Sequence, residues 1–240
     1  MKYRHRTRRR PAQGATFGGR VAFAVRFLAA LFALAGLDAV APAPAGAASL
    51  TVQINDDTGH PLPFAVVGLM AADGSVPRVR PPAGLTATII DQRDETFVPY
   101  VVAITKGGSV TFRNSDTTRH HVYTFAPIHP FEFILKPGDV SPPQVFDKPG
   151  IAAIGCNIHD HMIAYVYVSD TPLVAVSGHD GKAVIADVPP GRYAVQVWYP
   201  QLKPGITVAP VTAVIAAIPV DLTVPVPAIP FVDDMMDGMN

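Results

Sequence analysis

Short apolar runs alternate with turn residues along most of the chain. Near residue 50, Leu50, Val52 and Ile54 alternate with polar neighbours, which is the period of a half-buried strand. Similar segments, bounded by Gly, Pro, Asn or Asp, follow at short intervals. These predicted strands cover residues 64–70, 85–90, 100–105, 109–113, 120–125, 131–135, 144–147, 151–155, 163–168, 173–177, 182–187 and 192–198, with more strands within 206–224. The pattern predicts an all-β protein made of a Greek-key sandwich and a second, smaller β-sandwich.

The composition agrees with this prediction. Among 240 residues there are 25 Pro and 19 Gly, so long helices are disfavoured. Hydrophobic residues make up 49% of the chain, which is enough to fill the cores of two small domains. A chain of this kind is a folded β protein rather than a disordered one.

The first 47 residues have the features of a secretory signal peptide. Seven arginines between residues 4 and 26 precede an uncharged apolar run at 27–37, and Ala-Gly-Ala at 45–47 suits signal peptidase. The apolar run is shorter than the roughly 20 residues that span a bilayer. We therefore expect a signal peptide at 1–47, a periplasmic protein, and no stable membrane insertion after cleavage.

The remaining residues carry an excess of negative charge. Residues 48–240 contain 11 Lys and Arg against 18 Asp and Glu, a net charge of −7. This balance offers no basic surface for phosphate backbones, so we expect no nucleic-acid partner. The sequence also lacks a nucleophile elbow, a phosphate loop and a Ser-His-Asp order, and we expect a protein that is not an enzyme.

A single cysteine lies in a segment rich in metal ligands. Cys156 cannot form an intramolecular disulfide, and it is followed by His159 and Met162 in the spacing C-x-x-H-x-x-M between two predicted strands. A further ligand can come from the polar loop that ends at His120 and His121. A thiolate, two imidazoles and a weak thioether favour a copper site for electron transfer. Zinc is the rival metal, because Cys and His also bind it tetrahedrally, and a buried, inert Cys156 is the alternative without a metal.

The segment from residue 86 to 168 resembles the cupredoxins, the type 1 blue-copper proteins that include plastocyanin and amicyanin. The resemblance rests on F-R-N-S-D-T-T-R-H-H-V and on G-C-N-I-H-D-H-M, whose short ligand loop is amicyanin-like. The blocks I-I-D-Q-R-D-E-T-F-V-P-Y, H-H-V-Y-T-F and F-D-K-P-G are similar to periplasmic plastocyanin-like proteins labelled methylamine utilisation proteins. The resemblance implies one type 1 copper ion, with the ligands His120, Cys156, His159 and Met162.

Two positions depart from the family's pattern. His121 stands where many cupredoxins have an Asn that braces the cysteine loop, and His161 stands where the similar proteins have Trp. Both histidines are possible accessory ligands.

Two flanking segments resemble the halves of another β module. Residues 180–198 are similar to the second half of the carboxypeptidase regulatory-like, or transthyretin-like, sandwich, and residues 52–69 to its opening strand pair. We therefore expect a split sandwich formed by 48–71 and 171–227, a linker at 72–85, a cupredoxin domain at 86–170 inserted into it, and a disordered tail rich in Met and Asp at 228–240. The alternative is that the first two strands extend the cupredoxin sheet.

The resemblance implies a periplasmic carrier of single electrons that meets a transient redox protein partner. Two other functions remain open. The protein could deliver or buffer copper, or it could be a structural β module that a metal stabilises.

Overall fold

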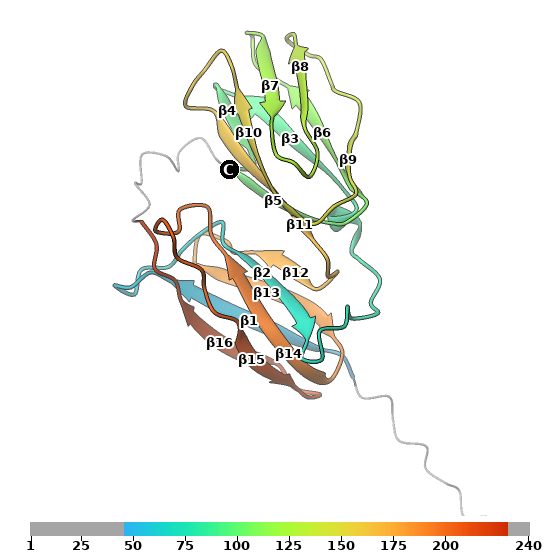
Figure 1. Ribbon diagram of the computed structural model, residues 1–240, viewed down its shortest axis with the longest axis vertical. Helices are drawn as coiled ribbons and strands as arrows, with labels where there is room; N and C mark the ends of the chain where they lie inside the picture. Colours follow the sequence, from blue (N-terminus) through green and yellow to red (C-terminus); the bar gives the residue numbers. More distant parts are fainter. Residues whose placement is uncertain (1–45, 230–240) are drawn as a thin grey trace, which may run out of the picture. The chain divides into compact units, whose positions relative to one another are not determined.

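The computed structural model describes residues 46–229, which form an all-β protein. The expectation of an all-β fold is confirmed. Figure 1 shows the strands in two groups, each made of two sheets. The only helical element among the described residues is a 3-10 turn, Ala83–Leu85. No helix in this part of the chain has the length and apolar character needed to cross a membrane.

The first sandwich is formed by the strands β3 to β11. Its five-stranded sheet has the order β5-β11-β10-β7-β8, and its four-stranded sheet has the order β4-β3-β6-β9. The strands are β3 (Ala87–Arg93), β4 (Thr96–Val98), β5 (Val101–Thr105), β6 (Gly108–Asn114), β7 (His120–Thr124), β8 (Phe131–Leu135), β9 (Gln144–Phe146), β10 (Gly150–Cys156) and β11 (Ile163–Ser169).

The core of this sandwich extends to the candidate ligands. In β6 and β7 every second side chain is buried, as the period of two requires. Phe112, Phe146 and Ile154 are fully buried in one hydrophobic cluster, which also contains Cys156 and Met162. Two of the four predicted ligands are therefore part of the hydrophobic core.

The second sandwich is formed by two separate parts of the chain. One sheet has the order β13-β1-β16 and the other β12-β2-β14-β15. Val52 of β1 pairs with Ala183 on one side and with Leu222 on the other. The strands are β1 (Ala48–Asn55), β2 (Val66–Ala71), β12 (Val174–Val176), β13 (Lys182–Val188), β14 (Gly191–Trp198), β15 (Val211–Ile215) and β16 (Val220–Pro225).

These pairings bear on the alternative in which β1 and β2 extend the sheets of the first sandwich. Both strands instead pair with strands from 174–225. The side chains of β1 and β2 pack in one core with those of β13 to β16. The two parts are thus one sandwich, and residues 87–169 form the other between them. The likeness of the split sandwich to the carboxypeptidase regulatory-like module stays a prediction.

Strand limits differ from the sequence prediction at a few points. The predicted strand at 85–90 begins later, because residues 83–85 form the 3-10 turn, and it continues to Arg93. The strand Thr96–Val98 was not predicted. Residues 1–45 of the predicted signal peptide and residues 230–240 of the predicted tail lie outside the described residues. The prediction that the disordered tail begins at residue 228 is wrong at its first residues, because Ala228 is buried and pairs with Leu202, and the N–H of Ile229 donates to the carbonyl of Gln201.

Candidate metal centre

Two neighbouring strands bring the first two candidate ligands together. Cys156 is the last residue of β10 and pairs with Val122 of β7, whose first residue is His120. The N–H of Asn157 donates a hydrogen bond to the carbonyl of His121, so the ladder continues into the cysteine loop. The Cys156 sulfur lies 3.7 Å from Nδ1 of His120.

The loop between β6 and β7 is held by a buried asparagine. Asn114 is fully buried, and its Nδ2 donates to the carbonyls of Thr118 and Leu135. Its Oδ1 accepts a hydrogen bond from the N–H of Asp116. Because the side chain binds both ends of the loop, the start of β7 and the ring of His120 have a fixed position.

The third candidate ligand, His159, lies in the loop after Cys156. The N–H of Met162 donates to the carbonyl of His159, which closes a turn in this loop. His159 Nδ1 lies 3.8 Å from the Cys156 sulfur and 3.2 Å from Nδ1 of His120. The three ligand atoms all lie within 4.8 Å of one another.

The spacing of these atoms fits one metal ion. Zinc, for example, lies about 2.0 Å from an imidazole nitrogen and about 2.3 Å from a thiolate sulfur. The two imidazole nitrogens are 3.2 Å apart, and the sulfur lies 3.7 and 3.8 Å from them. An ion bonded to all three atoms at about these bond lengths would have ligand–ion–ligand angles of roughly 105–125°. These angles are close to those of a trigonal plane, which is the arrangement of two His and one Cys in electron-transfer copper sites.

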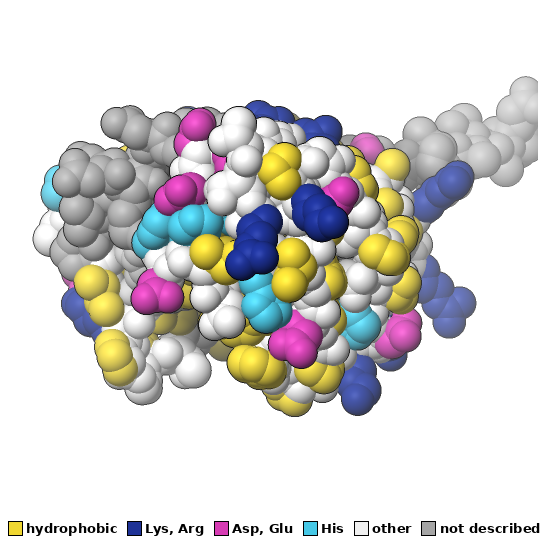
Figure 2. Space-filling model, turned by 90° about the horizontal axis from the view of Figure 1, so that it is seen from above, with side chains coloured by type: hydrophobic (Ala, Val, Ile, Leu, Met, Phe, Trp, Pro, Cys, Tyr) yellow, Lys and Arg dark blue, Asp and Glu magenta, His cyan; other side chains and the backbone are white. Residues whose placement is uncertain are grey.

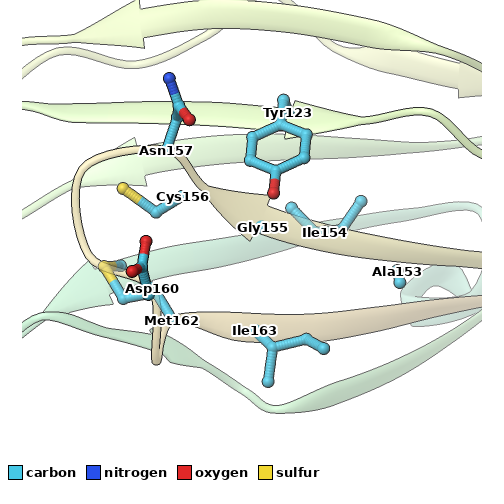
Figure 3. A pocket seen from close by; sticks show the side chains of 9 residues that line it. All are labelled: Tyr123, Ala153, Ile154, Gly155, Cys156, Asn157, Asp160, Met162 and Ile163. Carbon is cyan, nitrogen blue, oxygen red and sulfur yellow. The ribbon is translucent and has the colours of Figure 1, made fainter.

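Met162 lies beside this group. Its side chain is 3% exposed and packs in the same cluster as Cys156. In Figure 3 the sulfur atoms of Met162 and Cys156 point to the same side, away from Tyr123 and Ile163. The thioether therefore lies on the side of the loop to which the thiol points, and its role as a weak fourth ligand stays a prediction.

The outer nitrogen of His120 contacts a carboxylate. His120 is fully buried, and its Nε2 lies 2.7 Å from Oδ2 of Asp116. Since an ionised carboxylate can only accept, this contact favours the tautomer with the proton on Nε2 and the lone pair of Nδ1 directed towards Cys156 and His159. Carboxylates commonly orient metal-bound histidines in this way. Sequence analysis missed Asp116, although its position four residues before His120 was a usable signal.

His159 also has a carboxylate at its outer nitrogen. Its Nε2 lies 3.4 Å from Oε1 of Glu95, in the turn between β3 and β4. The side chain of His159 is 17% exposed, whereas that of Glu95 is 48% exposed. No local sequence pattern links these two residues, because strands distant in sequence bring them together.

The two possible accessory ligands lie outside the group of three. His121 has Nδ1 3.4 Å from the Asn157 amide nitrogen and Nε2 3.7 Å from Glu132. The exposed His161 has its ring centre 6.2 Å from that of His159. His121 therefore contacts the cysteine loop from β7, in the position where the resemblance led us to expect an Asn.

An ion cluster forms around the buried carboxylate of Asp91. Asp91 accepts hydrogen bonds from Arg93, Arg113 and Ser115. Burial opposes ionisation of Asp91, yet these hydrogen bonds lower its pKa from 3.8 to about 2. The cluster connects β3 to the loop that carries Asp116, so it fixes the start of that loop.

A pocket lies over the strand that leads to Cys156. Figure 3 shows Tyr123, Gly155 and Ile163 around it, with Asp160 near Met162. A Cβ atom at Gly155 would lie 2.9 Å from Cζ of Tyr123. The glycine therefore lets the tyrosine ring cover the backbone next to the thiol.

Viewed from above, the molecule carries histidines among basic, acidic and hydrophobic side chains, and no single type predominates (Figure 2).

Comparison with known proteins gives structural neighbours only. No family model matches the chain, and no curated protein matches it. Among solved structures, a copper-containing nitrite reductase from Thermus scotoductus SA-01 matches 34% of this chain with 26% identity and a TM-score of 0.31, and the match spans only 22% of the reductase. A purple cupredoxin from Nitrosopumilus maritimus matches 34% of this chain and 99% of its own, with 22% identity and a TM-score of 0.31. Amicyanin from Paracoccus versutus matches 45% of this chain and all of its own, with 19% identity and a TM-score of 0.31.

Proposed function

We propose that this protein binds one copper ion through His120, Cys156 and His159, with Met162 as a weak fourth ligand, and carries single electrons. The observation that supports the proposal is the group of two imidazole nitrogens and one thiol sulfur, all within 4.8 Å of one another. Bound copper supplies a one-electron couple.

The residues of the chain suit such a couple. The soft sulfur atoms of Cys156 and Met162 are acceptable to Cu(I) and the imidazoles to Cu(II), so the donor set suits both oxidation states. The ligands are held by a strand end, a buried asparagine and a closed turn, so the site has little freedom to rearrange when the charge of the ion changes. A rigid site of this kind lowers the cost of electron transfer.

Location and partner form part of the proposal. The predicted signal at 1–47 supports export to the periplasm. The net charge of −7 after residue 47 favours a transient redox partner with a basic surface, because opposite charges accelerate encounter. We propose no substrate and no catalytic residue.

The visible spectrum after loading with Cu(II) tests the proposal. We expect an intense thiolate-to-copper band that is lost in Cys156→Ser and kept in His161→Ala, which changes an exposed histidine outside the group of three. A wild-type protein without this band would contradict a copper–thiolate site. Zinc bound in preference to copper, measured by competition, would assign the site to zinc.

A second candidate function is copper delivery. It is favoured by the exposed His161, whose ring lies next to the partly exposed His159 at the edge of the site. Electrochemistry distinguishes the two functions. A reversible one-electron couple supports the carrier, whereas slow redox with ready loss of Cu(I) supports delivery.

A further inference from the structure

We propose that Glu95 is a positioning residue of the metal centre, which holds the outer edge of His159 and stabilises Cu(II) relative to Cu(I). The inference rests on the proposed copper function. It assigns a role to the turn between β3 (Ala87–Arg93) and β4 (Thr96–Val98), which no ligand pattern in the sequence includes.

The contacts form a closed ring that contains both imidazoles. Nδ1 of His120 lies 3.2 Å from Nδ1 of His159, and Nε2 of His159 lies 3.4 Å from Oε1 of Glu95. The backbone N–H of Glu95 donates to Oδ2 of Asp116 over 3.1 Å, and the same oxygen lies 2.7 Å from Nε2 of His120. The outer nitrogens of both histidines are thus linked through one turn.

The backbone of this turn is held in an unfavourable conformation. Asp94 and Glu95 have φ angles of 48° and 54°, in the left-handed region that residues with a side chain rarely adopt. Both of their N–H groups donate to the carboxylate of Asp116. Because these two hydrogen bonds stabilise the turn, Asp116 determines where the Glu95 side chain begins.

The carboxylate of Glu95 acts on the metal through the ring of His159. A negative charge at the outer nitrogen makes the coordinating nitrogen a stronger donor, which favours the more highly charged ion. Water reaches Glu95, whose side chain is 48% exposed, so the effect is smaller than that of a buried carboxylate.

Glu95→Gln tests this role, since it removes the charge and keeps the size of the side chain. Loss of such a partner weakens metal binding about 10- to 100-fold, and for this exposed group we expect the lower end, about tenfold weaker Cu(II) binding with Cu(I) binding unchanged. For a one-electron couple this raises the reduction potential by about 59 mV. Glu132→Gln is the matched control, because the carboxylate of Glu132 forms its ion pair with His121, which is not a ligand in this proposal.

A double-mutant cycle tests the path through the turn. In an Asp116→Ala background, the Glu95 backbone loses its acceptor, so Glu95→Gln should change the potential less than it does in the wild type. Asp94→Gly keeps the carboxylates of Glu95 and Asp116, and glycine readily adopts the positive φ at position 94. The reduction potential should therefore stay at the wild-type value.

The outcomes separate this inference from the proposed function. If the wild type shows a reversible copper couple and Glu95→Gln leaves its potential unchanged, or if Glu132→Gln shifts it equally, the role of Glu95 is wrong. An equal shift in both backgrounds would refute the positioning by Asp116. A wild type without a copper couple would instead refute the proposed function.

Discussion

Asp116 accepts a hydrogen bond over 2.7 Å from the ring nitrogen of His120 that faces away from the thiol. The imidazole is fully buried, so no water competes for this nitrogen. The interaction selects the tautomer in which Nδ1 is free to bind a metal. A carboxylate four residues away in the sequence therefore orients the ring of this candidate ligand.

Removal of this carboxylate should weaken copper binding. We expect Asp116→Ala to reduce copper affinity by about 10- to 100-fold, because the ring loses its hydrogen-bond partner and its fixed tautomer. Competition with a chelator of known affinity measures the change. Asp221→Ala removes an exposed carboxylate from the second sandwich and should leave the affinity unchanged. Equal affinities for the wild type and Asp116→Ala would contradict the prediction.

Replacement of the thioether should alter the potential and leave the fold intact. Met162 is buried, and exchange of Met for Leu usually costs less than about 1.5 kcal/mol. Met162→Leu removes a donor, which destabilises the higher oxidation state more, so we expect a more positive potential with the thiolate band retained. Voltammetry and the visible spectrum check both parts. A potential identical to that of the wild type would show that the sulfur of Met162 is not a ligand.

Acid should remove the stabilisation that Asp91 supplies. Its pKa in the folded protein is about 2, below the ordinary value of 3.8, so the ionised form stabilises the fold above about pH 4. This contribution of about 2 kcal/mol is lost as the pH falls from about 4 to about 2. Urea unfolding of the wild type and of Asp91→Asn should show a difference that shrinks over this range. A difference that does not change with pH would refute the assignment.

A glycine in the second sandwich tests the split arrangement. Gly181 has a φ of 72°, and a Cβ there would lie 2.6 Å from the carbonyl oxygen of Ile54 in β1. We expect Gly181→Ala to destabilise the protein by about 2–4 kcal/mol, from backbone strain and from this clash. Gly59→Ala is the control, since Gly59 also has a positive φ but nothing lies within 4 Å. Its cost should be only about 1 kcal/mol. Thermal unfolding measures the loss of stability in both variants. Equal losses for Gly181→Ala and Gly59→Ala would contradict the close contact of residue 181 with β1.

Strands with strict alternation were predictable from the sequence. Leu50, Val52 and Ile54 are all fully buried, as their period implied. The strand Thr96–Val98 was missed because it has three residues and follows a turn of Asp94 and Glu95 without Gly or Asn. Tertiary hydrogen bonds to Asp116 stabilise that turn, and a local pattern contains no information about them.

In the candidate site, too, the local spacing of residues was predictable from the sequence, whereas contacts between distant segments were not. The spacing of Cys156, His159 and Met162 within one loop was visible in the sequence, and the structure places the first two of these beside His120. Their roles as metal ligands stay predictions. The contact of Glu95 with His159 was not predictable, because it depends on how the β3–β4 turn lies against the loop after β10.

The interrupted second sandwich has a consequence for synthesis of the protein. When the ribosome has synthesised the chain up to residue 169, every strand of the first sandwich, β3 to β11, is present, whereas β1 still lacks both of its neighbours. One edge of β1 stays unpaired, and its apolar side chains stay incompletely covered, until β16 (Val220–Pro225) has been synthesised. At that stage the nascent chain therefore contains one complete sandwich and, before it, the unpaired apolar strand β1. This strand is the part that a chaperone would have to shield from aggregation.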